Sequence, residues 1–124
     1  MKISLNPKAK DAATRDALVA EGGFGKYYTD HMVVCEWNEK EGWSEPELKP
    51  YGPISLDPAT AVFHYGQEIF EGMKAYRQPD GGIGLFRPEA NARRFAKSAN
   101  RLALPEMPEE LFIETVETLV KQDA

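Results

Sequence analysis

Short extended runs joined by turn residues constrain the fold of this chain more than any other feature of its sequence. Residues 32–37 combine β-branched and aromatic side chains, which is typical of a β-strand, and residues 38–42 have the composition of a turn. Residues 43–51 return in an extended run that Pro46 and Pro50 interrupt. Because proline cannot donate to a ladder of hydrogen bonds, we expect this return strand at the edge of a sheet.

A second hairpin is predicted further along the chain. Residues 73–77 and 83–87 are short extended runs, and the segment between them contains a proline and two glycines, which is turn chemistry. Between the two hairpins, Asp57 and Pro58 resemble a helix N-cap followed by proline at the first helical position. We therefore expect a short helical turn there, through Val62.

Two helices are expected after the hairpins. From Pro88 to Leu102 the apolar side chains recur at three- and four-residue steps, which predicts one face of a helix that ends before Pro105. A second amphipathic pattern follows Pro108. The predicted fold class is therefore α+β, with an antiparallel sheet that is built from hairpins and packed by two C-terminal helices.

The first residues differ in character from the rest of the chain. Residues 1–21 are polar, carry scattered charges and include Pro7, so we expect a flexible N-terminal arm, followed by one domain over residues 22–124. The last predicted helix reaches the end of the chain without a glycine cap or a closing element. We therefore expect the chain to be a truncated piece of a longer protein.

Composition excludes several classes of function. The formal net charge of -5 opposes binding to nucleic acid and to anionic membranes, and no apolar run approaches the length of a membrane span. Cys35 is the only cysteine and the two histidines are far apart, so we expect no internal disulfide and no metal site. The start does not have the pattern of a signal peptide, which favours a cytoplasmic location.

One stretch carries a specific resemblance. Residues 64–77 read His-Tyr-Gly-Gln-Glu-Ile-Phe-Glu-Gly-Met-Lys-Ala-Tyr-Arg. They resemble the signature of the fold-type IV aminotransferases, which use pyridoxal 5'-phosphate (PLP), in which a short bend separates a tyrosine from a Phe-Glu-Gly sequence. Residues 24–32, 83–88 and 91–105 agree in order and spacing, so that the resemblance covers about residues 22–120.

The subfamily that the sequence resembles most is that of the branched-chain amino acid aminotransferases. The lead-in that contains Thr-Asp-His-Met at residues 29–32 and Glu-Gly-Trp at residues 41–43 favours them. D-amino acid aminotransferases and aminodeoxychorismate lyases remain close alternatives within fold type IV. A third possibility is a self-standing, non-catalytic binding module that has the fold of this small domain, although no distinct interaction motif supports it.

The resemblance implies that residues 22–124 are the N-terminal small domain of such an enzyme. In the family, the active site lies between this domain and a larger one, which supplies the Schiff-base lysine and most of the contacts to the cofactor. None of the nine lysines of this chain has the sequence context of that lysine. We therefore expect no catalytic residue here, an inactive fragment, and a homodimer when the enzyme is complete.

Arg94 is the candidate cofactor-binding residue. It matches the family position whose arginine contacts the PLP phosphate, and a guanidinium suits a phosphate better than an ammonium because it offers a planar fork of donors. The alternative is that Arg94 and its basic neighbours Arg93, Lys97 and Arg101 are a solvated helix face, as runs of charge usually are. The motif match favours the phosphate contact.

Three aromatic residues are the candidate substrate-binding residues. Phe24, Tyr65 and Phe70 match family positions that line the pocket for the substrate side chain, where each methylene is worth about 1–3 kcal/mol. Without the match, each would more often be ordinary core. Glu71 has no visible partner in the sequence, so we leave it out of the catalytic set. Gly72 is assigned a geometric role at the entry to a strand.

The resemblance therefore implies a function for the complete protein. It would transfer the amino group of leucine, isoleucine or valine to 2-oxoglutarate, with PLP as electron sink. Branched-chain amino acids and 2-oxo acids would be its small-molecule partners, and the missing large domain would be its structural partner. This chain would supply a contact to the phosphate and part of the wall of the substrate pocket.

Overall fold

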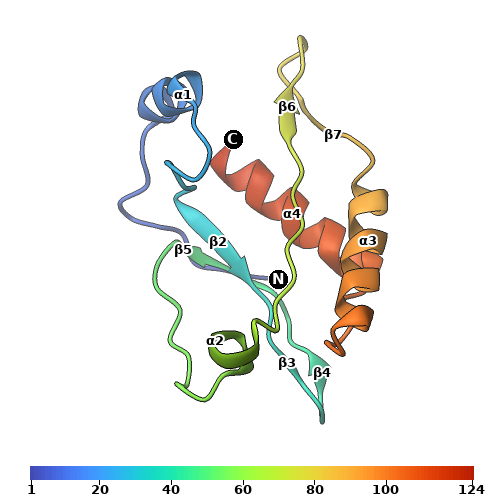
Figure 1. Ribbon diagram of the computed structural model, residues 1–124. Coiled ribbons are helices and arrows are strands. Elements are labelled where there is room, and N and C mark those ends of the chain that lie inside the picture. Colours follow the sequence, from blue (N-terminus) through green and yellow to red (C-terminus); the bar gives the residue numbers. More distant parts are fainter. The chain divides into compact units, whose positions relative to one another are not determined.

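The computed structural model describes every residue from Met1 to Ala124 and has mixed α and β content (Figure 1). Its contacts divide the chain into two units, one of Met1–Pro53 with Lys121–Ala124 and the other of Ile54–Val120. The predicted α+β class is confirmed. The domain boundary that we expected after residue 21 stays a prediction.

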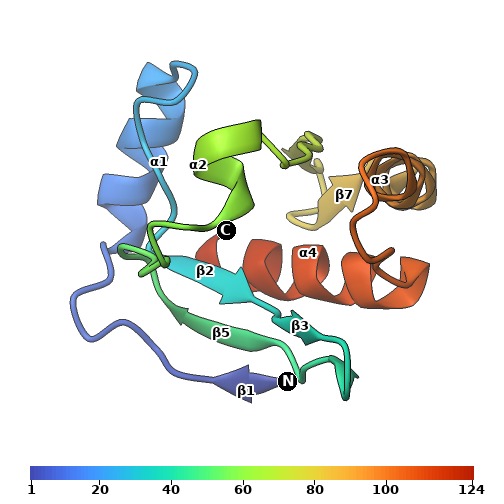
Figure 2. The same ribbon diagram turned by 60° about the horizontal axis from the view of Figure 1, so that its bottom comes forward.

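A three-stranded sheet forms the centre of the first unit (Figure 2). Its strand order is β1 (Lys2–Ile3), β5 (Glu47–Pro50), β2 (His31–Val34). β2 pairs antiparallel with β5, whereas β1 pairs parallel with it and places Ile3 opposite Leu48. Leu48 lies in the middle strand and is only 1% exposed, so the sheet has its buried centre there.

The position of β5 corrects one expectation. We expected this proline-containing strand at an edge, but it lies between β1 and β2. Pro46 precedes the strand, and its carbonyl oxygen accepts a hydrogen bond of 2.9 Å from the Lys2 N–H. Pro50 is the last residue of the strand and lies opposite His31. Because both prolines lie at the ends of the strand, the residues between them keep the N–H groups that a central strand needs.

Both predicted hairpins are confirmed. At the far end of the first hairpin, β3 (Trp37–Asn38) pairs antiparallel with β4 (Gly42–Trp43). In the second hairpin, β6 (Ala75–Arg77) pairs antiparallel with β7 (Ile83–Leu85). The strands form three separate sheets, however, and the β1–β5 pair is parallel, so the expected arrangement as an antiparallel sheet is correct only for the hairpins.

Residues 1–21, which we expected to form a flexible arm, contain regular structure. β1 is followed by α1 (Ala12–Glu21), whose N-cap is Asp11. The Asp11 side chain accepts a 2.8 Å hydrogen bond from the Thr14 N–H, and this contact lowers the pKa of Asp11. The Ser4 N–H donates to the Leu48 carbonyl at 2.8 Å. Local capping and a distant strand therefore order a segment whose polar composition did not indicate structure.

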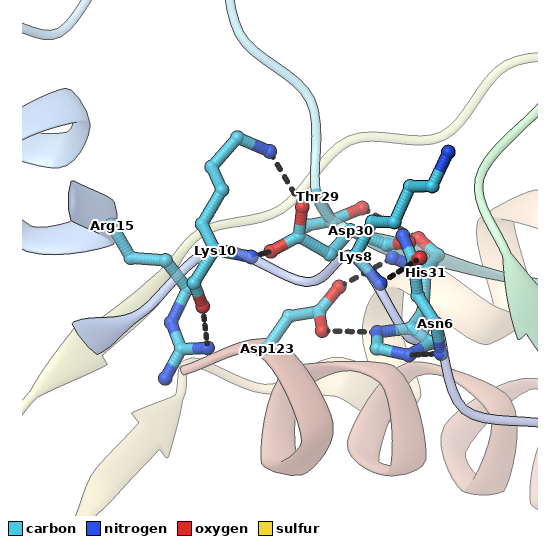
Figure 3. A network of polar contacts seen from close by, with 8 residues as sticks. All are labelled: Asn6, Lys8, Lys10, Arg15, Thr29, Asp30, His31 and Asp123. Atoms are coloured by element: carbon cyan, nitrogen blue, oxygen red, sulfur yellow. Dashed lines mark hydrogen bonds and ion pairs between the residues drawn. The ribbon is translucent and has the colours of Figure 1, made fainter.

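A buried histidine connects distant parts of the first unit (Figure 3). Nδ1 of His31 lies 2.6 Å from a carboxylate oxygen of Asp123, and the His31 backbone N–H donates to the other oxygen at 2.8 Å. Nε2 of His31 accepts a hydrogen bond of 2.8 Å from the Asn6 N–H. Because Nε2 is an acceptor, the ring is neutral and carries its proton on Nδ1, which satisfies both contacts.

Asp30, the neighbour of His31, is buried as an ion pair. Its carboxylate accepts hydrogen bonds from Nζ of Lys10 at 2.5 Å and from the Lys10 backbone N–H at 2.9 Å (Figure 3). The side-chain hydrogen bond from Lys10 lowers the pKa of Asp30, against the opposing effect of burial. The pair ties the segment before α1 to the start of β2.

The two expected C-terminal helices are confirmed in the second unit. α3 (Pro88–Arg101) begins with proline at its first position, and α4 (Glu109–Asp123) follows it. The rings of Phe95 and Phe112 lie 5.2 Å apart between these helices. The last residues of α4 group with the first unit.

Few apolar side chains are buried in either unit. They are Leu48, Ala92, Ala99 and Phe112. Many large apolar side chains are exposed instead, including several aromatic residues of the second unit. No helix combines the length and apolar character that a membrane crossing requires.

Candidate functional site

The motif at residues 64–72 begins in a short helix. Asp57 starts a turn, with the Thr60 N–H donating to its carbonyl at 2.9 Å. The N-cap of α2 (Ala61–Tyr65) is Thr60 and not Asp57, so the helix begins after the predicted first position at Pro58 and ends beyond Val62. Gly66 ends α2 with a left-handed φ of 58°. The chain then leaves the helix in a segment without regular structure, residues 67–72, which leads toward β6.

Three side-chain contacts attach residues 67–72 to α3 and the turn after it. Nε2 of Gln67 donates to the Leu102 carbonyl at 2.8 Å. At the other end of the segment, Nδ2 of Asn91 donates to the Gly72 carbonyl at 3.1 Å. Between them, Arg94 binds Glu71. The segment is thus held by side-chain contacts with a helix and the turn after it, both distant in sequence, and not by strand pairing.

The Glu71–Arg94 contact is a two-point ion pair. Nε of Arg94 lies 3.0 and 2.9 Å from the two carboxylate oxygens of Glu71, and Nη2 also donates to this carboxylate. The Glu71 side chain is 5% exposed and that of Arg94 is 68% exposed. The hydrogen bonds between them lower the pKa of Glu71 and raise that of Arg94, so both groups are charged at neutral pH.

The pair leaves part of the guanidinium free. A guanidinium has five N–H donors. Glu71 engages Nε and Nη2, which form one edge of the fork, so the Nη1 edge of Arg94 faces away from the carboxylate. An exposed edge with parallel donors is suited to a second oxyanion, and a phosphate fits this geometry. The residue that we predicted as the phosphate contact therefore has the donors and the exposure that a phosphate needs.

Of the predicted pocket residues, Phe70 lies on this segment and Tyr65 lies just before it. Tyr65 is the last residue of α2 and is 85% exposed, and Phe70, next to Glu71, is 83% exposed. A Cβ at Gly72 would lie 3.3 Å from Cε1 of Phe70, which is tighter than ordinary packing. The glycine thus lets the Phe70 ring approach the backbone, which supports the geometric role predicted for Gly72.

Known proteins with similar sequences provide a second, independent line of evidence. No protein-family model matches the chain. The chain is 55% identical over 121 residues to a branched-chain-amino-acid aminotransferase of Mycolicibacterium smegmatis, a match that covers 98% of the chain and 33% of the relative. It is 53% identical over 123 residues to a probable branched-chain-amino-acid aminotransferase of Streptomyces coelicolor, with 98% and 34% covered.

A yeast protein extends the comparison beyond bacteria. The cytosolic branched-chain-amino-acid aminotransferase of Saccharomyces cerevisiae is 51% identical over 123 residues, with 99% of the chain and 32% of the relative covered. All three relatives are named as branched-chain-amino-acid aminotransferases, and the chain is similar to each of them over nearly its whole length. The chain spans about one third of the length of these relatives. The resemblance to this aminotransferase family that the sequence motifs indicated is therefore confirmed.

The remaining candidate, Phe24, lies in the first unit. It is in the loop between α1 and β2, and its side chain is fully exposed. A cavity of about 250 Å³ in the same unit is lined by residues such as Leu18, Tyr27 and Asp30. None of Phe24, Tyr65, Phe70 and Arg94 lines this cavity. Their roles in an aminotransferase site stay predictions.

The sequence alone did not indicate the role of Glu71. We left it out because it had no visible partner, but the structure pairs it with Arg94 across 23 positions of sequence. Asn91 and Gln67 were also missed as residues that hold the segment. No local sequence signal could have found these contacts, because each joins residues that are 19 or more positions apart.

Proposed function

We propose that this chain is part of a PLP-dependent aminotransferase that transfers the amino group of leucine, isoleucine or valine to 2-oxoglutarate. In this proposal residues 22–124 form the small domain of a fold-type IV enzyme. The rest of the protein supplies the cofactor lysine, and the complete enzyme is a homodimer. The observation that carries the proposal is that a half-free guanidinium on α3 is bound to Glu71, the residue next to the exposed ring of Phe70.

The role of Arg94 is to hold the phosphate of PLP. Its open Nη1 edge offers donors to a phosphate, while the edge bound to Glu71 fixes the direction of the fork. PLP, when bound, supplies the electron sink for the transfer of the amino group. The phosphate contact contributes affinity and orientation, and the residues of this chain carry out no proton transfer.

The role of Phe24, Tyr65 and Phe70 is to shape the pocket for the substrate side chain. An aliphatic side chain offers no hydrogen bond, so an enzyme selects it through apolar contact, at about 1–3 kcal/mol for each methylene. The exposed ring of Phe70 provides apolar surface next to Glu71, the partner of Arg94, and the exposed ring of Tyr65 provides apolar surface at the end of α2. The Tyr65 hydroxyl adds a polar end to this wall.

The cytoplasmic location stays a prediction. Of two yeast relatives, one is named as cytosolic and is 51% identical, and the other is named as mitochondrial and is 46% identical. Both compartments therefore contain proteins similar to this chain.

The phosphate contact is tested by Arg94→Ala in the complete protein. Loss of a charge-assisted contact should weaken PLP binding by roughly ten- to a hundredfold, while folding is retained. Arg94→Lys keeps the charge without the planar fork, so its affinity should lie between those of the wild type and Arg94→Ala. Titration of PLP into the apo forms, followed by absorbance, measures each dissociation constant.

Arg93 provides the matched control. It precedes Arg94 on α3, but its Nη1 contacts Glu109 at 3.2 and 3.3 Å, away from the motif segment. Arg93→Ala should leave the PLP dissociation constant within about twofold of the wild type, because it removes an exposed pair. Equal PLP affinity in the wild type and Arg94→Ala would refute the phosphate contact.

A further inference from the structure

We propose that Glu71 is a positioning residue for the cofactor phosphate: it holds one edge of the Arg94 guanidinium so that the other edge presents its donors in a fixed direction. The inference rests on the proposed function, because it assumes that Arg94 binds the phosphate. It assigns a role to the glutamate of the Phe-Glu-Gly sequence that neither the relatives' names nor the motif alone provides.

The anchored end of the pair is Glu71. Its side chain is 5% exposed. Its carboxylate also receives a weak hydrogen bond of 3.4 Å from the Gly72 N–H and interacts with the side chain of Asn91. Arg94 is 68% exposed and projects from α3. A long, exposed arginine side chain would otherwise sample many rotamers, so a buried two-point partner removes that freedom before a ligand arrives.

A neighbouring pair on the same helix shows the difference. Arg93 contacts Glu109 through Nη1 alone, and the side chains are 63% and 34% exposed. Exposed pairs of this kind contribute little and leave the guanidinium mobile. Of these two pairs, only that of Arg94 combines a buried carboxylate with a two-point contact, which is the geometry that fixes orientation.

Glu71 also connects the two sides of the proposed site. Phe70, the residue before it, is an exposed ring that we assign to the substrate wall, and Gly72, the residue after it, is held by Asn91. The same backbone segment thus carries the proposed wall and the anchor of the phosphate-binding arginine.

Charge and positioning predict opposite effects for removal of the carboxylate. If Glu71 acted only through its charge, its negative charge would repel the phosphate dianion, and Glu71→Gln would strengthen PLP binding. If it positions Arg94, the amide introduced by Glu71→Gln offers one acceptor oxygen in place of two and no charge, so the two-point contact is lost, Arg94 gains rotamer freedom, and PLP binds more weakly. The sign of the change therefore distinguishes the two roles.

The experiment uses Glu71→Gln in the complete apo protein, with PLP and pyridoxal as probes. We expect the PLP dissociation constant to rise about three- to tenfold, the range that corresponds to freeing one rotamer-rich side chain. The dissociation constant of pyridoxal, which lacks the phosphate, should change less than twofold. Glu109→Gln is the matched control and should leave both constants unchanged.

The same substitution in the Arg94→Ala variant separates this proposal from the proposed function. With Arg94→Ala already present, Glu71→Gln should cause no further loss of PLP affinity, because it acts through the arginine. If Arg94→Ala itself leaves PLP affinity unchanged, the proposed phosphate contact fails. If Arg94→Ala weakens PLP binding but Glu71→Gln does not, only the positioning role fails.

Two other outcomes would also overturn the positioning role. One is an equal loss of PLP and pyridoxal affinity in Glu71→Gln, which indicates a general structural defect. The other is tighter PLP binding, which indicates a charge effect alone. If Glu71→Gln does not fold, Glu71→Asp withdraws the carboxylate by one methylene while keeping its charge, and the comparison of PLP with pyridoxal is made with that variant.

Discussion

At the scale of single residues, Phe70 and Glu71 reverse the usual pattern of burial, because the apolar side chain is exposed and the charged one is buried. The phenyl ring is 83% exposed and the carboxylate is 5% exposed. Burial of the charge is compensated because Arg94 binds it at two points, whereas nothing in this unit covers the ring. An exposed aromatic ring beside a fixed charge pair is a local arrangement suited to contact a ligand with both an apolar and an anionic part.

Phe70→Ala tests the apolar part in the complete enzyme. The variant loses a section of the proposed wall, so kcat/KM for leucine should fall about tenfold or more, whereas the PLP dissociation constant should change less than threefold. Phe86→Ala is a suitable control, because Phe86 is also a highly exposed phenylalanine of the second unit and has no predicted role. An equal loss of kcat/KM in Phe86→Ala, or for a small amino acid substrate, would remove Phe70 from the pocket.

Sequence reasoning at this scale placed Arg94 on its helix but missed its partner. Helical periodicity relates residues three or four positions apart, whereas Glu71 and Arg94 are 23 positions apart. The alternative, a solvated basic face, is correct for the exposure of Arg94 but not for its contacts. A contact of this kind depends on how the bend after α2 lies on α3, and no local pattern encodes that.

At the scale of elements, the end of α3 contains a strained residue. The Leu104 N–H donates to the Ala99 carbonyl at 2.9 Å, and Ala103 adopts a φ of 54° to allow it. This is the left-handed position that usually contains glycine, because a Cβ there costs about 1–2 kcal/mol. The Ala99 carbonyl near the end of α3 thus has a hydrogen-bond partner, and Ala103 has a strained backbone as a consequence.

Ala103→Gly should therefore stabilise the chain. Relief of the strain outweighs the greater freedom of glycine in the unfolded state, and we expect a gain of about 0.5–1 kcal/mol in the free energy of unfolding. Ala96→Gly, in the interior of α3, should instead destabilise the chain by about 1 kcal/mol. Urea denaturation followed by circular dichroism measures both changes. A loss of stability in Ala103→Gly would contradict the strain argument.

Most elements followed from local signals, and the exceptions have identifiable causes. Turn residues predicted both hairpins, and apolar periodicity predicted α3 and α4. The central position of β5 was missed because its second partner, β1, is a two-residue strand without a strand-like pattern and lies more than forty positions away. α1 was missed because it is short, lacks a clear apolar face and has no buried residue, although the Asp11 cap was a usable signal.

At the scale of the whole molecule, buried carboxylates make stability depend on pH. The pKa of Asp30 is lowered by its hydrogen bond to Lys10, and that of Glu71 by its hydrogen bonds to Arg94. A carboxyl whose pKa is lower in the folded state contributes stability above its unfolded pKa, and this contribution declines as pH falls through the folded pKa. The unfolded values are near 4, so the loss begins at about that pH.

We therefore expect the free energy of unfolding to decrease steadily as the pH is lowered below about 4. Asp30→Asn removes one of the two groups, so it should lower stability at pH 7 and flatten the decrease in acid. Asp80→Asn, in the exposed turn of the second hairpin, is the control and should leave the slope unchanged. Urea midpoints measured at several pH values give the slope. An unaltered acid slope in Asp30→Asn would show that Asp30 does not contribute.

The contact between His31 and Asp123 also sets an order of events during synthesis. The two residues are 92 positions apart, and Asp123 satisfies both the ring and the backbone N–H of His31. As the chain grows from its N-terminus, residues 54–120 leave the ribosome before the residue that completes the first unit. The second unit thus has its whole sequence first, and His31, although made earlier, gains its carboxylate partner only when the end of α4 has been synthesised.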